Sequence, residues 1–301
     1  MKSEEQKPRI WIILLILGGL FIASLFVAGV VSLFSGEVSM GNVVIIPIRG
    51  TISGSEGGFF DTVVNSQDVI ADIEKAEKDP TVKGVIFEIN SPGGSAVASE
   101  EIAHAIKDMK KPNVAWIREV GASGAYWAAS SSDYIVASRM SITGSVGVLG
   151  SYIELAGFMQ RYNITYQRLV GGEYKDIGTP LRELSYDEEE ILQQKIDILH
   201  EFFLEEVKDN RKLDDRTVDQ ISTGVFFLGS EAKDLGLIDE IGSKKEAVAY
   251  LESQLKGTVT TKEYPKYKGL FAKLSEMSSH QAYYFGKGFG SNLFKQSFIT
   301  T

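Results

Sequence analysis

Residues 82–95 are VKGVIFEINSPGGS, an apolar run that ends in a turn with two consecutive glycines. Because the run over 82–89 is short, rich in β-branched residues and followed by turn residues, it predicts a buried strand. Apolar residues at helical spacing precede this strand over 68–78 and follow it over 95–109. Strands that alternate with helices are typical of layered α/β folds, so the stretch predicts a sheet covered by helices.

The same alternation continues on both sides of this unit. Residues 43–48 form an earlier apolar strand, and 113–117 form a later one. A helix is expected from Ser123 onward, and 134–137 return to strand. The predicted fold class is therefore α/β, with a layered β-sheet and helices.

A longer helix is expected after the alternating region. Ser185 and Glu188 form a capping-box pattern ahead of apolar residues spaced for an amphipathic helix. The apolar face of this helix is expected to pack in the core or against another subunit. A smaller unit over 224–242 and a helix near 244–255 complete the expected folded region.

Composition excludes several classes of protein. The 301 residues include 31 Lys and Arg against 40 Asp and Glu, and the net charge of −9 gives no electrostatic reason to bind nucleic acid. The absence of cysteine excludes disulfides, thiolate metal sites and a cysteine nucleophile. The three histidines, His104, His200 and His280, lack metal-ligand spacing. We therefore expect no metal, no cofactor and no nucleic-acid partner.

An apolar stretch near the N-terminus predicts a membrane anchor. The segment 10–34 carries no charged residue. It is longer than the roughly 20 residues that a helix needs to cross a bilayer. Secretory signals have shorter apolar regions, so we expect this segment to be retained. Lys2, Lys7 and Arg9 precede it, and the positive-inside rule places the N-terminus in the cytoplasm. The expected protein is a single-pass cell-membrane protein whose folded domain faces outward.

The sequence thus divides into five expected parts. They are a cytoplasmic N-terminus (1–9), a transmembrane anchor (10–34), a linker (35–41), a folded domain (42–256) and a C-terminal extension (257–301). The extension contains both lysines and aromatic residues, a composition typical of segments that lie at a membrane interface or insert into a groove. The alternative is a flexible tail.

Ser123 is the candidate nucleophile. It lies in Gly-Ala-Ser-Gly, residues 121–124, between an apolar strand and an expected helix. A serine at such a junction can present its hydroxyl at a helix N-terminus, where backbone N–H groups favour developing negative charge. The alternative is that the small residues only allow close packing of the helix on the strand.

The glycines after the 82–89 strand form a candidate oxyanion hole. Gly93 and Gly94 can direct consecutive backbone N–H groups into one concavity. A phosphate-binding loop is disfavoured because the pattern G-x-x-x-x-G-K-[ST] is absent. A plain tight turn remains the alternative.

A serine nucleophile needs a base, and Lys175 is the favoured candidate. An ordinary lysine titrates near pH 10.4, so a lysine base must be buried to favour its neutral form. Taken alone, a lysine in a glycine-containing loop would be a solvated surface residue. His104 is the alternative base, because it lies in the helix expected after the glycine turn. Ser145 is expected to hold the neutral amine by hydrogen bonding, unless it belongs to a polar turn.

Together these motifs resemble the signal peptide peptidase A family, membrane-anchored Ser/Lys peptidases of the Clp/crotonase superfold. The resemblance runs from about residue 43 to 255. It rests on Ser-Pro-Gly-Gly-Ser at 91–95, Ala-Ser-Gly at 122–124, Thr-Gly-Ser-Val-Gly-Val at 143–148 and Tyr-Lys-Asp at 174–176. It implies Ser123 as nucleophile, Lys175 as general base, Ser145 as the lysine-orienting residue and the N–H of Gly94, with Gly93 as a second candidate, as oxyanion donor.

The resemblance also implies an activity and partners. A serine endopeptidase of this kind forms an acyl-enzyme without metal or nucleotide and degrades cleaved signal peptides and other apolar peptides at the membrane. It implies a homo-oligomer with site residues near subunit borders. The rival interpretations are a stomatin-operon-type membrane protease that cuts a hydrophobic segment of a partner, a crotonase-type CoA enzyme, and a non-catalytic membrane scaffold.

Overall fold

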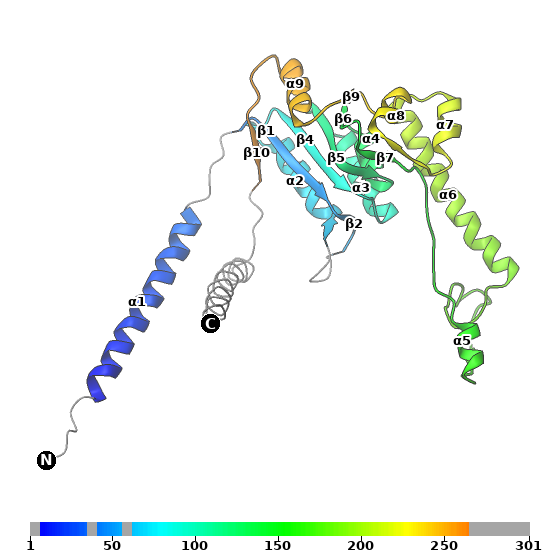
Figure 1. The fold of residues 1–301 in the computed structure, drawn as a ribbon, viewed down its shortest axis with the longest axis horizontal. Helices are drawn as coiled ribbons and strands as arrows, with labels where there is room; N and C mark the ends of the chain where they lie inside the picture. The colour runs from blue at the N-terminus through cyan, green and yellow to red at the C-terminus, as the bar shows by residue number, and fades with distance from the viewer. Residues whose placement is uncertain (1–6, 35–40, 56–61, 265–301) are drawn as a thin grey trace, which may run out of the picture. The chain divides into compact units, whose positions relative to one another are not determined.

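The computed structural model describes residues 7–34, 41–55 and 62–264. The chain divides into two units: residues 39–264 form the larger one, and the other contains helix α1 (Lys7–Phe34). The larger unit combines a mostly parallel sheet with helices (Figure 1), which confirms the predicted α/β class.

A sheet of eight strands among the described residues organises the larger unit. Its main path runs β10-β1-β4-β5-β6-β9, and each pair along this path is parallel. β7 continues parallel to the end of β5, β8 pairs antiparallel with β7, and β2 pairs with β3 in a small separate sheet. The strands are β1 (Val43–Arg49), β2 (Thr51–Ser53), β3 (Val63–Asn65), β4 (Gly84–Ser91), β5 (Asn113–Ala122), β6 (Ile135–Ala137), β7 (Ile142–Gly144), β8 (Phe226–Leu228), β9 (Glu240–Ile241) and β10 (Thr261–Glu263).

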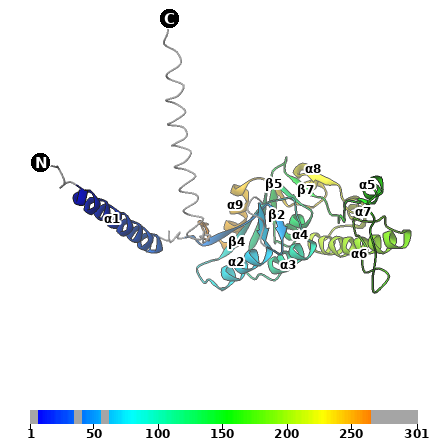
Figure 2. The ribbon, with the colours of Figure 1, turned by 90° about the horizontal axis from the view of Figure 1, so that it is seen from below.

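Both faces of the central strands are buried. Phe87 and Ile89 of β4 belong to the core shared with α2 (Ser66–Lys78), α3 (Ala96–Lys107) and α4 (Gly124–Ser130). Ile86 belongs to a second core with α9 (Lys244–Leu255), on the opposite face. Figure 2 shows α2 and α3 on one side of the strands and α9 on the other. Burial on both faces explains why the strand sequences are continuous apolar runs rather than alternating ones.

The sheet continues past the predicted domain end at residue 256. β10 pairs with β1, with Val43 opposite Thr261. Its sequence, Thr-Lys-Glu, carries no apolar pattern because it is a short edge strand, so sequence periodicity does not detect it. The larger unit therefore includes β10. The other boundaries expected between the five parts of the sequence stay predictions.

Helix α6 (Tyr186–Arg211) begins at the predicted capping box and projects from the sheet. Its C-terminal half is anchored by the buried side chains of Phe203 and Val207, whereas most of its N-terminal half is exposed. Figure 1 shows the segment between β7 and α6, with α5 (Ala156–Arg161), extending along α6 toward its N-terminal end. The short helices α7 (Asp215–Ile221) and α8 (Gly229–Asp234) follow α6.

Helix α1 lies in the other unit. Its described side chains, those of residues 11–24, are all exposed. In the described part of the chain, no helix combines the length and the apolarity needed to cross a bilayer. The membrane span expected over 10–34 stays a prediction.

We expect Tyr126→Phe to lower the free energy of unfolding by about 1–3 kcal/mol, because it leaves a buried acceptor without its donor. The Tyr126 hydroxyl is fully buried and donates to the Leu237 carbonyl at 2.8 Å, which ties α4 to the segment after α8. Urea unfolding at fixed protein concentration measures the change. Tyr186→Phe, at a side chain that is 80% exposed, is the control and should have almost no effect. Equal unfolding midpoints for both variants would contradict this assignment.

Candidate active site

Ser123 lies on a strained turn between β5 and α4. Its backbone angles, φ 53° and ψ −130°, fall in a region that non-glycine residues rarely adopt, at a cost of about 1–3 kcal/mol. Hydrogen bonds hold the turn: the Ser123 N–H donates to the Gly144 carbonyl at 2.8 Å, and the Ser123 carbonyl accepts from the N–H of Tyr126 and Trp127. Such a sharp strand-to-helix turn is typical of a nucleophile elbow.

The glycine turn after β4 is held by Ile52 of β2. The Ile52 N–H donates to the Gly93 carbonyl, and the Ser95 N–H donates to the Ile52 carbonyl, both at 2.9 Å. The Gly93 N–H is engaged by the Ser91 hydroxyl at 3.1 Å. The Gly94 N–H has no acceptor among the described residues. Of the two candidate oxyanion donors, the structure therefore leaves Gly94 available.

A second N–H beside Ser123 is available in the same place. The Gly124 N–H also lacks an acceptor among the residues that the structure covers. The two loops touch, because a Cβ on Gly93 would lie 2.8 Å from the Gly124 nitrogen and 2.9 Å from the Ser123 Cβ. Two free amides beside one serine hydroxyl have the arrangement of an oxyanion hole. Sequence analysis missed the Gly124 amide, although its position directly after a candidate nucleophile was the available signal.

Ser123 and Ser145 line one cavity. Its volume is about 580 Å³, and Gly94 and Gly124 also line it. Ser145 follows β7 with φ 51°, and its hydroxyl donates to the Gly224 carbonyl at 3.2 Å. The structure thus brings together three sequence-predicted site residues, Ser123, Ser145 and Gly94.

The remaining walls of the cavity are mostly apolar, and their apolar residues come from α3, α4, α6 and the segment after β7. Trp127 stacks on Phe203 with ring centroids 4.6 Å apart, and its indole N–H donates to Glu206 at 2.7 Å. The other apolar wall residues are Ala96, Val148, Leu149, Ile196 and Leu199. This lining suits apolar side chains of a ligand.

No histidine of the described chain lines this cavity. His104 contacts Glu206 at 2.8 Å, and His200 contacts the Val146 carbonyl at 3.1 Å. His280 lies outside the described residues. The structure therefore does not place the alternative base, His104, in the cavity. Glu100, His104 and Glu206 offer ligand atoms within 4.8 Å of one another and could hold a metal ion, but none of them lines the cavity.

One chain does not bring Lys175 into this cavity. The expectation of a buried amine beside Ser123 is not met within one copy, because Lys175 is exposed and absent from the cavity lining. Its neighbour Asp176 is bonded to Arg182, and Arg182 is bonded to Glu188 in the first turn of α6. From Glu188 the helix rises about 12 Å to Ile196, its first residue in the cavity wall, and about 22 Å to Phe203, its last. The path of the segment before α6 decides this placement, and local sequence patterns do not reveal it.

Comparisons with known proteins identify relatives of this chain. The model of a family described as peptidase family S49 matches residues 105–258. A protein of Methanocaldococcus jannaschii, provisionally named a protease, is 37% identical over 74% of this chain and 72% of its own length. A provisionally named signal peptide peptidase SppA of Enterococcus faecium is 30% identical over 73% of this chain. Protease 4 of Haemophilus influenzae is 34% identical over 68%.

The matches differ in how much of each relative they cover. This chain spans 65% of the Enterococcus protein and 34% of the Haemophilus protein, which is less than two thirds of either. The matches to the family and to these relatives confirm the resemblance to the signal peptide peptidase A family.

We expect Gly124→Ala to lower fluorophosphonate labelling of Ser123 about tenfold or more, because it displaces the amides that would hold the oxyanion. A Cβ at this position would lie 2.0 Å from the Ser99 hydroxyl oxygen and 2.7 Å from the Ser99 Cβ. Adding Ser99→Gly removes both clashing atoms and should restore part of the labelling. Gly257→Ala, where the nearest atom is 3.8 Å away, is the control. Full labelling of the Gly124→Ala single variant would show that the packing of these loops does not control reactivity.

Proposed function

Because this chain belongs to peptidase family S49 and is a serine peptidase, we propose that it cleaves apolar peptides, cleaved signal peptides among them, with Ser123 as nucleophile and Lys175 as general base. The observation that carries the proposal is the strained Ser123 turn, in a mostly apolar cavity, beside two backbone N–H groups that have no acceptor among the described residues. The printed name of the Enterococcus relative supports signal peptides as the substrate class.

The proposed reaction is acyl transfer. The neutral Lys175 amine takes the Ser123 hydroxyl proton as the oxygen attacks the peptide carbonyl carbon. The carbonyl oxygen becomes negative and accepts hydrogen bonds from the Gly94 and Gly124 N–H groups. When the C–N bond breaks, the Lys175 ammonium returns its proton to the leaving nitrogen. Water, deprotonated by the same amine, then releases the acyl group and restores Ser123.

Ser145 is proposed to orient the amine as a hydrogen-bond acceptor. Its own hydroxyl hydrogen is engaged by the Gly224 carbonyl, so its oxygen presents lone pairs to the cavity. A neutral amine has two N–H donors and one lone pair. If one N–H of Lys175 donates to Ser145, the lone pair is free to take the Ser123 proton.

We propose that Lys175 enters the cavity from a second copy of the chain. Within one copy the amine is exposed and does not line the cavity, and its turn is bonded to the first turn of α6. The same segment exposes large apolar side chains, Leu149 by 86%, Ile153 by 76% and Leu169 by 96%, which supports an interface there. A head-to-tail contact would cover this surface and desolvate the amine. Repeated around a closed assembly, it would give the homo-oligomer with site residues near subunit borders that the family resemblance implies.

A membrane anchor is proposed for residues 10–34. The uncharged sequence and the exposed apolar side chains of 11–24, such as Trp11 and Leu15, support it. The lysines and arginine before the segment favour a cytoplasmic N-terminus and an extracytoplasmic catalytic domain. An apolar cavity near a bilayer would meet signal peptides at high local concentration.

Complementation between two inactive variants tests the source of the base. Ser123→Ala and Lys175→Ala should each lower hydrolysis of a fluorogenic signal peptide by about 10³-fold or more. Co-expressed in equal amounts with different affinity tags, the two chains should recover about one quarter of the wild-type rate per chain, because one subunit pair in four joins an intact serine to an intact lysine. Lys195→Ala, at an exposed lysine on α6, is the control for charge removal. An inactive mixed assembly would refute a base supplied by a second copy.

Membrane attachment is tested by removing residues 1–38. The full chain should remain in the membrane pellet after alkaline carbonate extraction, because an apolar helix in the bilayer resists it, and the truncated chain should appear in the supernatant. External protease on intact cells should digest the catalytic domain. Protection of that domain in intact cells would overturn the proposed topology.

A further inference from the structure

A network of four charged side chains surrounds the turn that carries Lys175. Arg168 donates to both carboxylate oxygens of Asp176, at 2.9 and 2.8 Å, and Arg182 donates to the same oxygens at 3.2 and 3.0 Å. Arg182 also donates twice to Glu188, each time at 2.6 Å. Such two-pronged contacts restrict orientation as well as distance.

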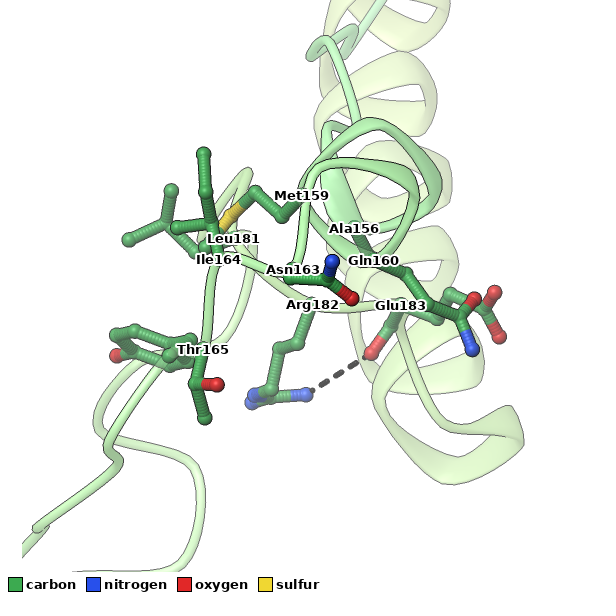
Figure 3. Close-up of a pocket in the computed structure, with 10 residues that line it drawn as sticks. Ala156, Met159, Gln160, Asn163, Ile164, Thr165, Leu181, Arg182 and Glu183 are labelled. Carbon is green, nitrogen blue, oxygen red and sulfur yellow. Dashed lines mark hydrogen bonds between the residues drawn. The ribbon is translucent and has the colours of Figure 1, made fainter.

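The network fixes the backbone on both sides of Lys175. Besides Asp176, Arg168 reaches the Glu173 carbonyl at 2.6 Å, so one guanidinium holds the residues two before and one after the lysine. Figure 3 shows the Arg182 side chain beside the neighbouring pocket, which residues of α5 line. The volume of this pocket is about 510 Å³, and Lys175 is not among its lining residues.

The network is joined rigidly to α6. Glu188 is buried and closes the capping box, because the Ser185 N–H donates to its carboxylate at 3.0 Å and the Glu188 N–H donates to the Ser185 hydroxyl at 3.3 Å. Hydrogen bonds from Arg182 lower the pKa of Glu188 to about 2, and those from Arg168 and Arg182 hold the pKa of Asp176 well below its usual range. Both carboxylates therefore stay ionised near neutral pH.

The Lys175 amine is left out of this network. It has no hydrogen bond or ion pair with any residue in the described ranges, although a carboxylate is next to it in sequence. Both oxygens of Asp176 accept from arginines, so this carboxylate is not available to capture the lysine as an ammonium.

We infer that Asp176 is a positioning residue for the base: together with Arg168 and Arg182 it holds the Lys175 turn on the N-terminal end of α6, so that each copy presents a preformed lysine to its neighbour. The inference rests on the proposed function. A lysine held in place before assembly loses less entropy when it enters the second copy's cavity, and misplacement by about 1 Å can lower a rate about 10²-fold. Asp176 does not touch the reacting atoms, so its effect passes through Lys175.

The experiment places Asp176→Asn on either member of the complementing pair. On the Ser123→Ala chain, which donates the lysine, it should lower kcat about 10- to 100-fold and change KM less than about threefold. On the Lys175→Ala chain, which donates only the serine, it should lower the rate less than about twofold. Asp176→Glu on the lysine donor should recover more activity than Asp176→Asn, because it keeps the charge for both arginines. Asp187→Asn, at an exposed carboxylate in the first turn of α6, is the matched control.

The outcomes separate this inference from the proposed function. Equal losses on the two chains would show a general effect on folding or assembly and overturn the positioning role. Unchanged activity on the lysine donor would overturn it too. An inactive parent pair, without any change at Asp176, would refute the second-copy base itself and the role of Asp176 with it. Size-exclusion chromatography of each mixture confirms that the compared assemblies have the same size.

Discussion

Two backbone loops pack closely at glycine positions, where a Cβ on Gly93 would lie 2.8 Å from the Gly124 nitrogen, and this packing determines where the reactive groups lie. A Cβ on Gly94 would meet the Ile52 carbonyl at 2.0 Å, and one on Gly124 would meet the Ser99 hydroxyl at the same distance. The loops follow β4 and β5, neighbouring parallel strands whose carboxyl ends lie at one edge of the sheet, where α/β folds place ligands. The sheet therefore positions the free amides and the strained Ser123 turn together, and the surrounding hydrogen bonds offset the strain.

Helix α6 connects this site to a surface far from it. Its C-terminal half closes the cavity through Phe203, which stacks on Trp127, while its first turn binds the segment that carries Lys175. The turn that carries Lys175 is bonded to Glu188 near the start of this helix, about 12 Å before Ile196, the first residue of the helix that lines the cavity. In the proposed assembly, this helix would also set the position of the lysine relative to a second copy of the chain.

The charged network around Asp176 restricts the orientation of the turn that carries Lys175. Ion pairs at partly exposed positions contribute little to stability, and Arg168 is about one third exposed. Two guanidinium groups that each bind both oxygens of one carboxylate nevertheless restrict the turn more than a single contact could. The network holds the backbone around Lys175 and leaves the amine unpaired within the described residues, which is the arrangement that the proposed presentation of the lysine to a second copy requires.

The sequence by itself determined the alternating elements and the local chemistry. The expected strand over 82–89 and the helix over 95–109 correspond to β4 (Gly84–Ser91) and α3 (Ala96–Lys107), because hydrophobic periodicity and glycine turns are local signals. The same signals indicated Ser123, Gly94 and Ser145, which follow strand ends that the sheet brings into one cavity. Only the tertiary structure decided that the Gly93 amide is engaged, that the Gly124 amide has no acceptor in the described part of the chain and that Lys175 does not line the cavity. Those facts depend on contacts between residues distant in sequence and on the length of α6, and no local pattern of residues specifies either.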